Sequence, residues 1–213
     1  MKKKKTILAA VVLLLVAIVG GAIAYFTDTD EKTNTFTIGN VDITLTEPNW
    51  DTTDTTPANG VPDAAEDLMP GETVAKNPII NNESTKNPAY VFAKVVVPCT
   101  TETTPQEIFT YTVNTDAWTE LSGEAVACTS GGNATHVYYY GTSGTLTELA
   151  KAANASTPTP TTKAVFDSVT VRGTLTGSEG LTGNKNVVVT GYGIQKDGLA
   201  SAVPATVWGY FSN

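Results

Sequence analysis

Histidine is almost absent from this sequence, since His136 is the single one among 213 residues. Zinc peptidases of the common helical type place two histidines four residues apart next to a glutamate, and His136 has no such neighbours. A serine or cysteine nucleophile would need the same histidine as its base, and neither cysteine stands in a recognisable catalytic signature. We therefore predict that the protein is not an enzyme and that His136 has a structural or surface role.

Arginine is equally scarce, because Arg172 is the only one and no group of lysines replaces it in the body of the chain. The formal net charge is −8, and loss of the four lysines at residues 2–5 would make the remaining chain more acidic. Such a surface cannot neutralise phosphates, so we expect no nucleic-acid partner. Solubility outside the cell is the plainer interpretation of the charge.

The one long hydrophobic run stands at the start of the chain. Residues 2–5 are all lysine, and residues 7–24 contain no charged or strongly polar side chain, which is the pattern of a secretion signal. Ala22 and Ala24 give the small residues that a signal peptidase needs, and they favour cleavage before Tyr25. The run is also close to the length that spans a bilayer, so retention as an anchor stays open. We predict export to a secreted, extracellular or cell-surface location.

Only two cysteines occur, Cys99 and Cys128, and both lie in the exported part. A disulfide is the first expectation in an oxidising compartment, and a pair of free thiols is the alternative. A disulfide that closes a loop of about 30 residues would stabilise the fold by roughly 3–4 kcal/mol.

Helical patterns are rare after the leader, and the chain is rich in threonine and in segments that alternate with period two. The many short strands predict an all-β fold, an antiparallel β-sandwich, because a barrel would need more even spacing. A capping box at Thr145 predicts one short helix over residues 145–153. Pro70 and Gly71 predict a turn. The strands expected are residues 35–38, 41–46, 73–81, 89–97, 108–113, 117–121, 135–140, 165–175 and 186–194, of which 89–97 is apolar on both faces and is expected to be central.

The apolar phase changes near the start of the exported chain. Phe36 and Ile38 are apolar at even positions, whereas Val41 and Ile43 are apolar at odd positions. A shift of one residue sends every side chain to the opposite face of a sheet. The change at residues 39–40 therefore predicts a bulge, a corner or a passage from one sheet to another.

Acidic side chains gather in two places without the spacing of an EF-hand. They are Asp28, Asp30 and Glu31, and then Asp51, Asp54, Asp63, Glu66 and Asp67. We expect no cofactor, and calcium held by the acidic loop is the open alternative. The tyrosines at 138, 139 and 140 could stack on a sugar, but interior packing or assembly is the better interpretation.

Three segments carry a resemblance to a known family. They read GGAIAYFTDTDEKTNTFTIGNVDITLTE, LMPGETVAKNPIINNESTKNPAYVFAKV and VVVTGYGIQKDGLASAVPATVWGYF. These segments resemble the TasA and camelysin family, whose members are exported through a signal peptidase of SipW type. The resemblance covers residues 1–97 and about 164–211, whereas the centre with both cysteines departs from the family pattern.

The resemblance implies a jelly-roll sandwich that assembles with copies of itself into fibres of the biofilm matrix or the cell surface. In this family the segment after the cleavage site adds as a strand to the neighbouring subunit. Phe26, Phe36 and Ile38 would then fill apolar slots of that neighbour, while backbone hydrogen bonds complete its sheet. An accessory assembly protein is a further possible partner. Camelysin-like relatives also carry a metallopeptidase label.

We accordingly divide the chain into a signal peptide (1–24), an N-terminal donor segment (25–40) and a β-sandwich domain (41–213). The predicted function is a secreted structural subunit of extracellular surface or biofilm-matrix fibres that assembles by donor-strand exchange. The alternatives are an adhesin that stays anchored in the membrane by its leader and a camelysin-like metallopeptidase.

Overall fold

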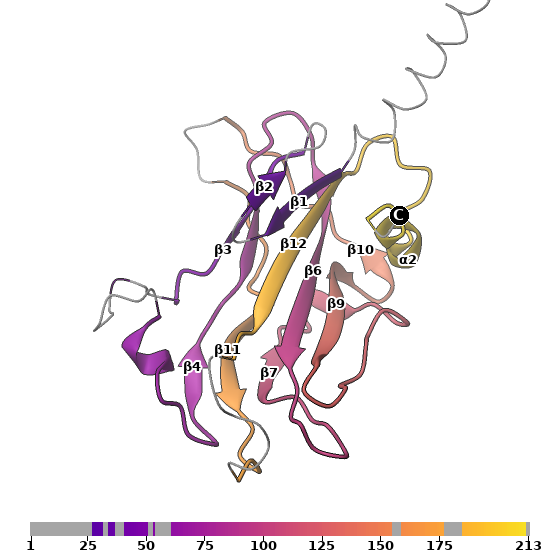
Figure 1. Ribbon diagram of the computed structural model, residues 1–213. Helices are drawn as coiled ribbons and strands as arrows, with labels where there is room; N and C mark the ends of the chain where they lie inside the picture. Colours follow the sequence, from indigo (N-terminus) through magenta and orange to yellow (C-terminus); the bar gives the residue numbers. More distant parts are fainter. Residues whose placement is uncertain are drawn as a thin grey trace, which may run out of the picture.

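The computed structural model describes residues 27–31, 34–36, 41–50, 53, 61–154, 159–176 and 185–211. These residues form two layers of antiparallel strands with one short α-helix (Figure 1). The prediction of an all-β sandwich with one short helix is confirmed. The predicted signal helix and the change of phase at residues 39–40 lie outside the described residues.

The first layer is a seven-stranded sheet in the order β10-β9-β6-β12-β1-β2, with β8 paired to β9. Figure 1 shows β1, β12, β6 and β9 side by side. All the neighbouring strands of this sheet are antiparallel. The strands are β1 (Thr27–Glu31), β2 (Asn34–Phe36), β6 (Ala89–Pro98), β8 (Trp118–Glu120), β9 (Asn133–Thr142), β10 (Thr145–Leu146) and β12 (Val188–Gln195).

The second layer consists of two short sheets that continue one another. One pairs β3 with β5, and the other has the order β4-β11-β7. Thr162 donates its N–H to the carbonyl of Ile80, and Val165 donates to Pro78, each at 2.9 Å, so the chain leading into β11 lies alongside β5. The strands are β3 (Ile43–Thr46), β4 (Thr73–Ala75), β5 (Ile79–Asn82), β7 (Phe109–Val113) and β11 (Phe166–Val171).

Strand β6 is central, as its sequence predicted. The side chains of Val91, Ala93, Val95 and Val97 are fully buried between the two layers. On the opposite face, Phe92 is equally buried and belongs to a second apolar cluster. A strand covered on both faces needs apolar residues at successive positions, which explains why β6 does not alternate.

The outer face of the large sheet is covered by helix α2 (Pro204–Trp208), which begins with Pro204 at a position that needs no N–H donor. The Trp208 ring lies 5.4 Å from Phe92 and 5.0 Å from Tyr192, measured between ring centroids. This helix was not among the expected elements. In the described part of the chain, no helix has the length and apolar character needed to cross a membrane.

The helix predicted over residues 145–153 is wrong. Its first residues form β10, and Leu149 exchanges both backbone hydrogen bonds with Ala89 at 2.9 and 2.8 Å. The buried side chain of Asn82 also holds this segment, because its Nδ2 donates hydrogen bonds to the carbonyls of Leu149 at 3.3 Å and Ala150 at 3.0 Å. These tertiary partners hold the backbone extended and override the local helical pattern.

The turn predicted at Pro70 and Gly71 is confirmed. Gly71 has φ of +91°, and Glu72 donates its N–H to Met69 at 3.0 Å. The strand predicted over residues 73–81 is interrupted between β4 and β5, where Pro78 offers no donor to a ladder. The strand predicted over 165–175 ends at Val171.

Candidate functional site

The N-terminal strands lie at the end of the large sheet. Strand β1 pairs antiparallel with β12 of the same chain, in a register that places Asp28 opposite Gly193 and Asp30 opposite Gly191. The chain then turns back, so that β2 pairs with β1 and Phe36 lies opposite Thr29. In the isolated chain, the segment predicted to be donated therefore forms the edge of its own sheet (Figure 1).

Most residues predicted for cleavage and donation cannot be placed. Ala22, Ala24, Tyr25, Phe26 and Ile38 lie outside the described residues. Phe36 is described as the last residue of β2, through its backbone pairing alone. For the N-terminal segment, the structure thus gives the backbone pairing of β1 and β2 in the large sheet.

Strand β12 has glycine where the second layer packs on it. A Cβ atom at Gly193 would lie 2.8 Å from Cγ2 of Ile43 and 3.3 Å from Cγ1 of Val41. Both of these side chains are fully buried. The residues that directly follow the N-terminal segment are therefore anchored in the core, on the same strand whose edge β1 covers.

Cys99 and Cys128 form a disulfide, with their Cα atoms 5.7 Å apart. Cys99 directly follows β6, and its N–H donates to Gly132 at 2.9 Å. Gly131 in turn donates to Thr100 at 2.9 Å. The disulfide and these hydrogen bonds fasten the loop before β9 to the end of β6.

His136 lies on β9 between two carboxylates that come from different strands. Its Nε2 is 2.8 Å from Oε1 of Glu107, which precedes β7, and its Nδ1 is 2.8 Å from Oε1 of Glu120 on β8. Glu107 leads into the second layer, whereas Glu120 and His136 belong to the first. This charged row, Glu107, His136 and Glu120, therefore connects the two layers at one side of the sandwich.

The carboxylates hold the imidazole in its charged form. The hydrogen bond that His136 donates to Glu107 raises the pKa of His136 to about 9, partial burial acts in the opposite direction, and the hydrogen bond to Glu120 adds to the rise. An imidazolium donates from both nitrogens and has no lone pair for a metal. Both ring nitrogens of His136 are thus engaged by carboxylates, and its structural or surface role stays a prediction.

Metal ligands do not converge in the described residues: no three side chains of histidine, cysteine, aspartate or glutamate are arranged to hold an ion. Of the acidic loop, Asp63, Glu66 and Asp67 are described, whereas Asp51 and Asp54 are not. Calcium binding by this loop stays a prediction.

The three consecutive tyrosines face different environments. Tyr138 and Tyr139 are buried, and Tyr140 packs against Trp118 at 5.3 Å between ring centroids. The hydroxyl of Tyr138 lies 3.0 Å from that of Tyr111, and burial raises the pKa of Tyr138 to about 12. Tyr138 and Tyr139 thus pack in the interior, whereas Tyr140 is half-buried.

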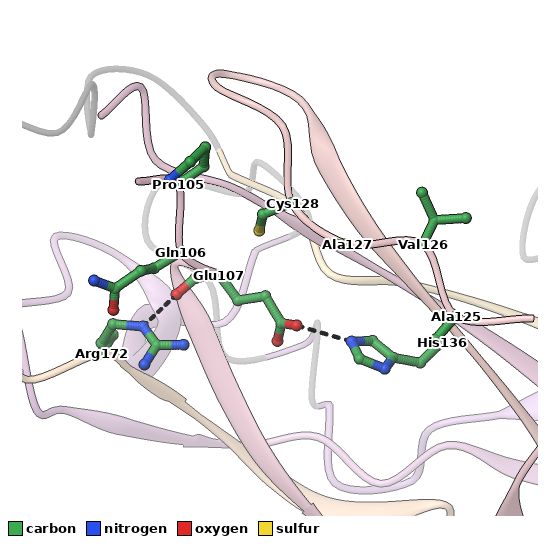
Figure 2. A pocket seen from close by; sticks show the side chains of 9 residues that line it. All are labelled: Pro105, Gln106, Glu107, Ala125, Val126, Ala127, Cys128, His136 and Arg172. Carbon is green, nitrogen blue, oxygen red and sulfur yellow. Dashed lines mark hydrogen bonds and ion pairs between the residues drawn. The ribbon is translucent and has the colours of Figure 1, made fainter. Parts of the chain in front are cut away.

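A pocket opens beside the charged row (Figure 2). It has a volume of about 540 Å³. Arg172 lines it next to Glu107 and donates from Nε to the carbonyl of Glu107 at 2.6 Å. Sequence reasoning missed this site, although the chain's only arginine and only histidine both line it. The lining residues are Pro105, Gln106, Glu107, Ala125, Val126, Ala127, Cys128, His136 and Arg172.

A comparison with protein families found a match for the N-terminal part of the chain. The model of the camelysin metallo-endopeptidase family matches residues 1–103. The resemblance to the TasA and camelysin family is therefore confirmed for this part, which ends before the pocket begins at Pro105. Comparisons with curated proteins and with solved structures found no match. The molecule is thus an all-β sandwich whose residues 1–103 are similar to the camelysin metallo-endopeptidase family.

Proposed function

We propose that this protein is a secreted structural subunit of extracellular surface or biofilm-matrix fibres, and that it assembles by donating residues 25–40 to a neighbouring copy. The family match and the basic, apolar leader support export through a signal peptidase of SipW type. The leader would hold the segment back until cleavage, because a terminus tethered in the membrane cannot insert into another subunit.

The observation that carries the proposal is the position of β1 and β2, which are the last two strands at one end of the large sheet. Five residues of β12, from Thr190 to Ile194, pair with β1 on one side, while β6 pairs with the other side. If β1 leaves, β6 still holds β12 in the sheet, but the backbone N–H and C=O groups on the open side of β12 lose their partners. An open edge of this kind recruits another strand.

Exchange between copies costs little in hydrogen bonds. A donated β1 from a second copy would restore the same ladder in the same register, so the gain and loss nearly cancel. The contact is head to tail, because the donor and the acceptor edge are different surfaces. Heterologous contacts that do not close on themselves build filaments. Assembly should therefore depend on protein concentration and on the freedom of the amino terminus.

The geometry of His136 argues against the peptidase that the family name suggests. Both ring nitrogens face carboxylates on opposite sides of the ring, which leaves no shared position for a metal, a carboxylate and the imidazole. We propose that the chain has no peptidase activity. A casein digestion with added zinc tests this, and chelator-sensitive cleavage that is lost in His136→Gln would contradict it.

Electron microscopy of three purified proteins tests the assembly. Residues 25–213 should form filaments, whereas residues 41–213 should stay monomeric and should bind a synthetic peptide of residues 25–40. The matched control keeps 41–213 but carries a shuffled order of residues 25–40, which preserves length and charge and removes the alternation. Filaments from 41–213 or from the shuffled protein would show that the segment is not the donor. A monomeric 25–213 protein, together with a full-length chain that keeps its leader in cells, would favour the anchored adhesin.

A further inference from the structure

The pocket around Arg172, here called the Arg172 pocket, has two walls of different character (Figure 2). One wall is residues 105–107, whose backbone pairs with the chain after β6, since Thr100 donates to Gln106 at 2.9 Å. The other wall is residues 125–128, which the disulfide at Cys128 fastens to Cys99. Both walls are thus held by backbone or covalent bonds, so the pocket is preformed.

Arg172 is held in place, but the two terminal nitrogens of its guanidinium have no partner among the described residues. Its backbone N–H donates to Ile108 at 2.8 Å, and its Nε donates to Glu107 at 2.6 Å. Among the described residues, no hydrogen bond or ion pair engages the two terminal nitrogens. The guanidinium is therefore held through Nε, while its two terminal nitrogens have no partner in the described part of the chain.

The carboxylate of Glu107 does not neutralise this cation. The side chain of Glu107 extends away from Arg172 toward His136, as Figure 2 shows, and pairs with the imidazole at 2.8 Å. Within the described part of the chain, Arg172 has no carboxylate at ion-pairing distance. A planar guanidinium with two free donors matches a carboxylate, which it binds through two parallel hydrogen bonds.

The opposite wall is an extended segment that pairs with β9 through a single bridge at Val126. Val126 exchanges both backbone hydrogen bonds with Thr135 of β9, at 2.8 and 2.9 Å. Because alternate residues of a strand direct their N–H and C=O groups to opposite sides, Ala125 and Ala127 direct theirs away from β9. Both alanines are exposed, and the Val126 side chain is 57% exposed. This edge can accept an extended chain, with an apolar contact beside it.

We propose that the Arg172 pocket binds the C-terminal carboxylate of an extended peptide. The fork of Arg172 holds the carboxylate, the edge at residues 125–127 pairs with the peptide backbone, and Val126 with Pro105 contacts its last side chains. The volume suits two or three residues at the end of a chain rather than a folded surface. The site lies beyond the residues that the family model matches and does not depend on fibre assembly.

Retention of synthetic peptides by the immobilised protein tests the proposal. Two pools of acetylated hexapeptides, randomised at the last three positions without acidic residues, differ only in a free or an amidated C-terminus. A third, amidated pool carries glutamate at the last position. We expect the free-acid pool to be retained at least tenfold better than either amidated pool, with apolar residues enriched at the end.

Variants distinguish a specific contact with Arg172 from a general effect of positive charge. Arg172→Gln should lose the retained peptides, Arg172→Lys should lose most of them, and Lys151→Gln, which removes an exposed cation elsewhere, should keep them. If Arg172→Gln fails to fold by thermal melting, Val126→Glu replaces it, because this exposed substitution places a competing carboxylate at the pocket. Equal retention of amidated peptides, equal retention of the glutamate pool, unchanged retention by Val126→Glu, or retention of no pool would overturn the proposal.

Discussion

Substitution of His136 by glutamine removes the cation from between Glu107 and Glu120 and should lower the free energy of unfolding at neutral pH. Because the charged row joins the two layers of the sandwich, its loss weakens a contact between elements that are distant in sequence. Glutamine keeps a polar side chain of similar reach, so the variant tests the charge more than the volume.

The size of the effect follows from the pKa of His136. A rise from 6.5 to about 9 corresponds to about 3 kcal/mol if the interaction is fully expressed. The imidazole is 22% exposed and Glu120 is 48% exposed, so water screens part of this energy, and we expect about 1–2 kcal/mol. The folded state has the higher pKa, so this stabilisation is complete below pH 6.5 and is lost as the pH rises through 9.

Urea unfolding of the wild type and of His136→Gln, followed by tryptophan fluorescence, measures the difference. The difference in the free energy of unfolding should be greatest below pH 6.5 and should vanish above pH 9. The contributions of other titrating groups are the same in both proteins and cancel in this difference. Since the chain has one histidine, the ring-proton signal in an NMR titration is unambiguous. A measured pKa near 6.5, or a stability difference that does not change with pH, would refute the reasoning.

Three further substitutions should destabilise the protein, as measured by denaturant unfolding. Gly193→Ala places a Cβ atom 2.8 Å from Ile43 and should cost about 1–3 kcal/mol, because the layers must move apart. Asn82→Ala removes a buried Nδ2 donor that bonds the carbonyls of Leu149 and Ala150 and should cost about 2–3 kcal/mol, because these hydrogen bonds are lost. Replacing both Cys99 and Cys128 by alanine frees a loop and should cost about 3–4 kcal/mol.

Each of these substitutions has a matched control. Gly173→Ala meets its nearest atom at 3.9 Å and should be close to neutral. Asn133→Ala removes an exposed asparagine at the start of β9 and should change stability little. Reduction of the wild type should reproduce the double cysteine variant. Equal losses from Gly193→Ala and Gly173→Ala, or from Asn82→Ala and Asn133→Ala, would mean that the packing and hydrogen bonds described here do not set the stability.

Local and strongly patterned features could be predicted from the sequence. The apolar residues of β6 required a strand covered on both faces, and the Pro70-Gly71 pair required a turn in which Gly71 adopts positive φ. These predictions depend on the residue types themselves and on their immediate neighbours. The all-β class followed from the same period-two pattern repeated along the chain.

Features that depend on distant partners could not be predicted in this way. The capping box at Thr145 is a valid local signal, but Asn82 and Ala89 supply hydrogen bonds from more than fifty residues away and hold that segment extended. The Arg172 pocket likewise combines four segments that only the fold brings together, namely residues 105–107, residues 125–128, His136 and Arg172. Its one signal in the sequence was the scarcity of arginine and histidine.

A covalent link between β1 and β12 tests donor exchange most directly. Glu31 lies opposite Thr190 in the ladder, so the pair Glu31→Cys and Thr190→Cys should form a disulfide wherever that ladder exists. In filaments of residues 25–213, we predict that oxidation links different subunits and gives a ladder of oligomers on a non-reducing denaturing gel. Filaments that dissolve into cross-linked monomers alone would mean that each β1 stays on its own β12, which would contradict assembly by donation.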